Sequence, residues 1–142
     1  MTINPEYLGR RLLERGFDNW FLYMFQAIEG HAFIVEPIHR GLFDYMNKLY
    51  KGEVTRLNIN IPPRAGKTTM AKYLLVYALT VNPKANIIYT SFSQSLLTDI
   101  ATSVHNILEH PIYKSMYPTN TIIHIPTVQA RIRAIVFRMK NL

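Results

Sequence analysis

The sequence contains no cysteine, which excludes disulfide bonds, thiolate catalysis and cysteine-ligated metal sites. No apolar run approaches the roughly 20 residues that a membrane-spanning helix needs. The N-terminal stretch MTINPEYLGRRLLERG also lacks the continuous apolar core of a secretory signal. These absences predict a soluble, cytoplasmic protein without a membrane partner. Acidic residues are scarce, with 9 Asp and Glu against 16 Lys and Arg, and none follows Glu109.

The net charge of +7 would suit a polyanionic partner, but it is unevenly spread. Residues 119–142 carry Arg131, Arg133, Arg138 and Lys140 and no acid, so more than half of the net charge lies there. Their periodicity fits both a basic helix and a strand over 128–137. We interpret this tail as the non-native end of a truncated or frameshifted product. A DNA-binding arm and a partial reading of a longer protein are the alternatives.

Three helices are predicted in an N-terminal lead-in, residues 1–52. The first has Asn4 as its cap, Pro5 as its first residue and Gly16 at its exit. The second carries an apolar stripe that we expect to pack against a sheet, formed by Phe17, Trp20, Phe21, Met24, Phe25 and Ile28. The third runs from Pro37 to about Lys51, and its predicted apolar face contains Ile38, Leu42, Tyr45, Met46 and Leu49.

The period changes in residues 53–118. Apolar residues alternate with asparagines in LNINI, residues 57–61, which indicates a strand. A helix is then predicted over 68–80, with an apolar face of Ala71, Leu74, Leu75 and Ala78. ANIIYTS indicates a second strand, and SQSLLTDIATSVHNILEH a helix that Pro111 ends. This order predicts an α/β fold with an incomplete P-loop NTPase parallel sheet, preceded by the N-terminal helices.

The loop IPPRAGKTT, residues 61–69, lies between the first predicted strand and its helix. Gly66 allows close backbone approach to a phosphate, and the helix start presents N–H groups to it. Lys67 can reach the terminal phosphates, and the Thr68 hydroxyl can ligate Mg²⁺. Prolines pre-set the loop, and Arg64 can add charge for phosphate. The predicted nucleotide-binding residues are Arg64, Ala65, Gly66, Lys67, Thr68 and Thr69. The alternative is a surface turn with an exposed lysine.

The run RLNINIPPRAGKTTMAKYLLVYAL, with NPKANIIYTSFSQSLLTDIATSVHNILEHPIYKSMYP after it, closely resembles the large subunit of tailed-phage terminases. The resemblance implies an ATP-driven, Mg²⁺-dependent motor that packages double-stranded viral DNA. Its partners would be the portal protein and the small terminase subunit, in the cytoplasm of an infected or lysogenic bacterium. It places Arg64 as a γ-phosphate sensor, segment Phe33–His39 on the adenine side, and Ser91 and Ser93 in a loop that couples nucleotide to DNA. For His39 the alternative is a helix-start residue, and for the serines it is helix capping.

Hydrolysis in this family needs a later aspartate and glutamate, and no acid follows Glu109. Glu36 precedes the loop and a helix-starting proline, which makes it a poor candidate for the base. The family's acidic nuclease centre is also missing. We therefore expect weak or absent turnover, no DNA cleavage, and self-association through uncovered apolar surfaces. A helicase-like P-loop protein and a non-catalytic nucleotide-binding remnant are the alternative functions, and whether the chain is an enzyme stays open.

Overall fold

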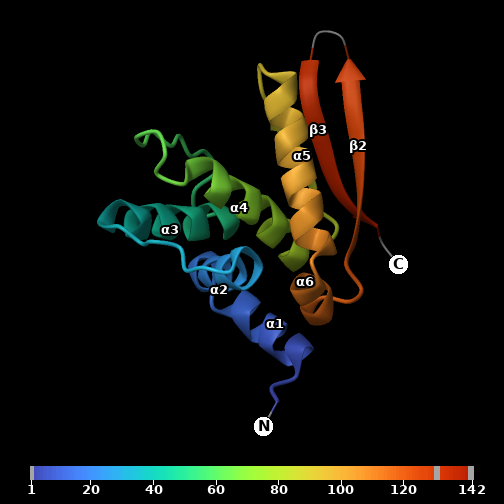
Figure 1. Cartoon of the computed structure of the whole chain (residues 1–142). Helices are drawn as coiled ribbons and strands as arrows, with labels where there is room; N and C mark the ends of the chain where they lie inside the picture. The colour runs from blue at the N-terminus through green and yellow to red at the C-terminus, as the bar shows by residue number, and fades with distance from the viewer. Residues whose placement is uncertain (1, 130–131, 141–142) are drawn as a thin grey trace.

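The computed structural model describes residues 2–129 and 132–140, as backbone alone from residue 121 onward (Figure 1). In chain order the elements are α1 (Pro5–Glu14), α2 (Phe17–Glu29), α3 (Pro37–Tyr50), α4 (Lys67–Val81), β1 (Asn86–Thr90), α5 (Gln94–Glu109), α6 (Pro111–Met116), β2 (Thr121–Gln129) and β3 (Ile132–Lys140). Figure 1 shows α1 to α4 grouped together, with the β2–β3 hairpin running alongside α5.

The predicted lead-in helices are confirmed. The side chain of Asn4 accepts a hydrogen bond from the Glu6 N–H at 2.9 Å, which caps α1 as expected. Gly16 separates α1 from α2 with a φ of 98°, a conformation that favours glycine. α2 then begins immediately, and the Asn47 side chain from α3 accepts from the Phe17 N–H at 2.8 Å. The third predicted helix ends within a residue of its expected boundary.

The apolar stripe of α2 forms the centre of the hydrophobic core. Phe17, Trp20, Phe21 and Met24 are fully buried, as the sequence predicts. The prediction that this stripe packs against a sheet is wrong. α2 packs against neighbouring helices, including α3 and α4. Aromatic rings of α4 fill the contact: Tyr77 lies 5.4 Å from Trp20 between ring centroids. Burial of each such side chain contributes about 1.5–3 kcal/mol to the stability of the fold. Because its neighbours are helices, the stripe stabilises a helical core.

The predicted parallel sheet is also wrong. Between residues 2 and 120 the only strand is β1, and the sheet is antiparallel with the order β1-β3-β2. The pairing of β1 with β3 runs from Asn86 opposite Arg138 to Thr90 opposite Ala134. The second predicted strand thus forms, but its hydrogen-bonding partner is the C-terminal hairpin and not the segment before the loop.

The first predicted strand, residues 57–61, does not form. Its burial alternates as expected, with the asparagines exposed and the apolar side chains half-buried. Ile59 and Ile61 pack against the helical core. No strand in the described part of the chain pairs with this segment, and an extended backbone without a hydrogen-bonded neighbour is not a sheet. The alternation therefore predicted which residues face the protein but not the sheet.

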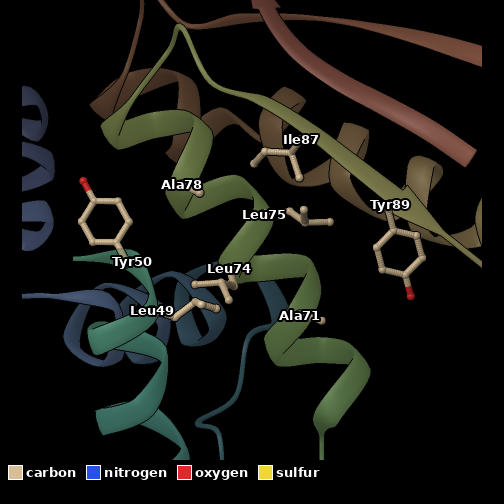
Figure 2. Close-up of a pocket in the computed structure, with 8 residues that line it drawn as sticks. All are labelled: Leu49, Tyr50, Ala71, Leu74, Leu75, Ala78, Ile87 and Tyr89. Atoms are coloured by element: carbon tan, nitrogen blue, oxygen red, sulfur yellow. The ribbon is translucent and has the colours of Figure 1, made fainter. Parts of the chain in front are cut away.

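Two predicted helix faces differ from the observed ones. In α3, Leu42 and Met46 are buried as predicted, but Ile38 and Tyr45 are exposed and His39 and Phe43 are buried in their place. In α4 the buried residues are Met70, Tyr73, Val76, Tyr77, Leu79 and Thr80. The predicted face of α4 is only half-buried and lines an apolar groove of about 360 Å³ (Figure 2), formed by Leu49, Tyr50, Ala71, Leu74, Leu75, Ala78, Ile87 and Tyr89. Apolar residues surround α4, so periodicity alone does not select its buried side.

The C-terminal part contains a helix that the sequence did not predict. Pro111 ends α5 as expected but also begins α6, and the His110 Nδ1 accepts from the Ile112 N–H at 3.2 Å. The tail forms the paired strands β2 and β3, so its described residues are extended and not helical. The single strand predicted over 128–137 is wrong in its bounds, because Val128 and Gln129 end β2 whereas residues 132–137 belong to β3. Arg131 lies outside the described residues, as do the side chains of Arg133, Arg138 and Lys140, so the basic-arm and non-native-end hypotheses stay predictions.

Candidate phosphate-binding loop

The predicted nucleotide-binding residues lie where α4 begins. Gly66 precedes the helix with φ 77° and ψ 13°, in the left-handed region. Arg64 is left-handed as well, with a φ of 66°. Glycine adopts this conformation freely, but it costs another residue about 1–2 kcal/mol. Residues held in such strained conformations cluster at ligand sites, so Arg64 is the first structural indication of a site here.

The first turn of α4 carries open hydrogen-bond donors. In the described residues no side chain caps this helix, and its first turn contains no acid. The side chains of Asn4, Ser93 and His110 cap the starts of α1, α5 and α6. The first N–H groups of a helix have no partner within it, and the helix dipole adds positive potential there. This end of α4 is therefore suited to an anion.

The side chains around this helix start are accessible. Arg64, Lys67 and Thr68 are exposed, whereas Ala65, Gly66 and Thr69 are half-buried. Thr69 lines another hollow, between α2, α4 and α5, together with Glu29 and Lys72. The structure thus brings two cations and the proposed metal-binding hydroxyl to the open end of α4, and it assigns Thr69 to a different surface.

His39 contacts the loop from the start of α3. Its Nδ1 accepts a hydrogen bond from the Glu36 N–H at 2.9 Å. The other ring nitrogen, Nε2, lies 2.8 Å from the Ala65 carbonyl oxygen. Because Nδ1 is an acceptor, Nε2 carries the hydrogen and donates it to Ala65. The expected role at a helix start is confirmed, and the bond to the loop joins residues that are far apart in sequence.

The Phe33 ring lies against the loop at Gly66. A Cβ added to Gly66 would lie 3.0 Å from two atoms of the Phe33 ring, which is too close for an ordinary contact. The ring itself packs edge-on against Phe21, Phe25 and His39. The positive φ of position 66 favours glycine, and a Cβ there would also require the Phe33 ring to shift by a few tenths of an ångström.

A cavity of about 310 Å³ opens beside the loop. It is lined by Phe25, His31, Ala32, Phe33, Ile34, Glu36, His39, Arg64, Ala65 and Gly66. The segment Phe33–His39, which the resemblance places on the adenine side, lies next to the loop in space. Glu36 contributes to the same cavity and precedes α3 as its N-cap residue.

The remaining predicted site residues have structural partners. Ser93 caps α5 through its hydroxyl oxygen, which confirms the capping alternative for this residue. The Ser91 hydroxyl oxygen accepts from the Ser93 N–H at 3.3 Å. Glu109 pairs with Lys114, whose hydrogen bond lowers the pKa of the carboxyl group.

Comparisons with protein-family models, with curated proteins and with solved structures found no match. The described residues contain no group of three or more His, Asp and Glu side chains that could hold a metal ion. None of the described helices is both long and apolar enough to cross a bilayer.

Proposed function

We propose that residues 64–68 bind the triphosphate of ATP together with Mg²⁺. The observation that carries this proposal is the uncapped start of α4, where Arg64, Lys67 and Thr68 are exposed around open N–H groups. Lys67 compensates the terminal phosphates as a point charge, and Arg64 makes bidentate contact with the γ-phosphate. The Thr68 hydroxyl ligates Mg²⁺. The cavity that Phe33 and His39 line accepts the adenosine side of the nucleotide.

The larger role that we propose is the ATP-binding part of a DNA-packaging motor of the terminase large-subunit type. This step is supported by the sequence resemblance, which also implies double-stranded DNA, the portal protein and the small subunit as partners. We expect weak turnover or none, because no acid follows Glu109 and that residue pairs with Lys114. Glu36 lines the cavity beside the loop, but it is engaged there as the N-cap residue of α3.

Calorimetric titration with MgATP tests the phosphate site. Lys67→Ala should weaken binding about tenfold or more, because a hydrogen bond to a charged group contributes on the order of 1.5–3 kcal/mol. Lys84→Ala is the matched control, since Lys84 is also exposed but lies beyond the other end of α4. Affinity should fall from ATP to ADP to AMP as phosphates are removed. Equal affinity of the two variants for MgATP would refute the phosphate-loop assignment.

A further inference from the structure

We propose that His39 is a positioning residue that sets the loop in its anion-binding conformation; this inference rests on the proposed function. The hydrogen bond from Nε2 to the Ala65 carbonyl oxygen, 2.8 Å long, fixes the peptide unit between Ala65 and Gly66. The described residues contain no cis peptide bond. In a trans peptide the carbonyl and the following N–H point in opposite directions. With the carbonyl held by α3, the Gly66 N–H faces away from α3.

The His39 ring has little freedom to move. His39 is only 4% exposed, and its ring packs edge-on against the Phe33 ring at 5.1 Å between centroids. The Glu36 N–H binds its Nδ1, so both ring nitrogens are engaged and the neutral tautomer with hydrogen on Nε2 is selected. His39 therefore presents a donor of fixed position and fixed direction to the loop.

The loop needs such a constraint because glycine rotates freely. A flip of the peptide between Ala65 and Gly66 changes the φ of Gly66, which costs glycine little. The flipped peptide would aim a carbonyl oxygen where the bound phosphate needs an N–H donor, which opposes anion binding. Loss of the His39 hydrogen bond should therefore reduce the fraction of molecules with a competent loop and weaken phosphate binding in proportion.

Two uncharged substitutions separate this role from simple stability. His39→Leu removes both hydrogen bonds and keeps an apolar side chain of moderate size. His39→Gln keeps an acceptor for the Glu36 N–H, as in a capping box, and an amide that can donate to Ala65. Affinities are measured by calorimetry at a temperature at which each variant is folded, with MgATP and with magnesium tripolyphosphate, which lacks a nucleoside.

His39→Leu should weaken both ligands by about tenfold, and His39→Gln by less than about threefold, as one hydrogen bond warrants. A stability role alone would lower the melting temperature and leave the affinity of the folded protein unchanged. Loss of affinity for MgATP but not for tripolyphosphate would show direct contact with the nucleoside and overturn the proposal. An equal loss of affinity in His39→Leu and His39→Gln would also overturn the proposal.

A second measurement requires no substitution. Nitrogen NMR of the imidazole in the unaltered chain should show the tautomer with hydrogen on Nε2, and the opposite tautomer would overturn the proposal. Failure of the phosphate site itself has a different signature. If Lys67→Ala leaves the affinity unchanged, the proposed function is wrong whatever the His39 variants do. Absence of MgATP binding by the unaltered chain would overturn both proposals.

Discussion

Arg64→Gly should change stability and nucleotide affinity in opposite directions. Arg64 has a φ of 66°, and relief of this left-handed strain favours the folded state by about 1–2 kcal/mol. The extra freedom of glycine in the unfolded chain opposes this gain by about 0.4–1 kcal/mol. The Arg64 side chain is exposed and forms no ion pair among the described residues, so little else is lost. The net expectation is a gain of about 0–1.6 kcal/mol.

The affinity of Arg64→Gly for MgATP should fall. If the guanidinium contacts the γ-phosphate, its removal costs on the order of 1.5–3 kcal/mol, or about tenfold to a hundredfold in Kd. Urea unfolding of the nucleotide-free protein measures the first effect, and MgATP titration measures the second. Arg64→Ala is the matched control, because alanine removes the charge and keeps the strain. It should lose affinity like Arg64→Gly without gaining stability.

A clear loss of stability in nucleotide-free Arg64→Gly would contradict the expected gain. Such a loss would mean that the arginine side chain supports the fold, so that its left-handed backbone has a structural cause. Unchanged MgATP affinity in both variants would remove Arg64 from the phosphate site and leave Lys67 and Thr68 as its only proposed side chains.

Two further predictions concern the helical core. Tyr117→Phe should destabilise the protein by roughly 1–3 kcal/mol in urea unfolding, because the buried Trp20 Nε1–H loses its acceptor at 3.0 Å; no change would mean that another acceptor replaces it. Stability should also fall above about pH 10, because burial raises the pKa of Tyr77 to about 12. The unfolded tyrosine ionises first, near pH 10, so the unfolded state binds fewer protons and Tyr77 removes up to about 1.4 kcal/mol per pH unit until about pH 12. Urea unfolding across this range measures the slope, and a flat profile would contradict it.

The helices were predictable because their signals are local. Asn4 and Ser93 precede their helices and cap them, and the α2 stripe repeats at helical spacing on one face. The sheet was not predictable from such signals, because strand pairing joins distant segments. The pattern of residues 57–61 is the same whether or not a neighbour pairs with it, and β1 pairs with β3 instead.

The candidate site was predictable in part. The glycine, lysine and threonine of the loop could be read from their order, and they lie at the start of a helix as expected. The contact of His39 with Ala65 could not be predicted, because no local pattern links a residue in the first turn of α3 to a loop 26 positions later. The capping bond to Glu36 was open to prediction, because the two residues have the spacing of a capping box.

The loop is held by helices, and this explains how it keeps its shape without a flanking strand. Before the loop, Ile59 and Ile61 pack against the helical core. After it, Met70 and Tyr73 of α4 are buried in the same core. Between these two anchors, the His39 hydrogen bond fixes one peptide unit and the Phe33 ring limits the space at Gly66. A loop fastened at both ends and at its centre can hold Arg64 in a strained conformation, because any relaxation would have to break buried contacts.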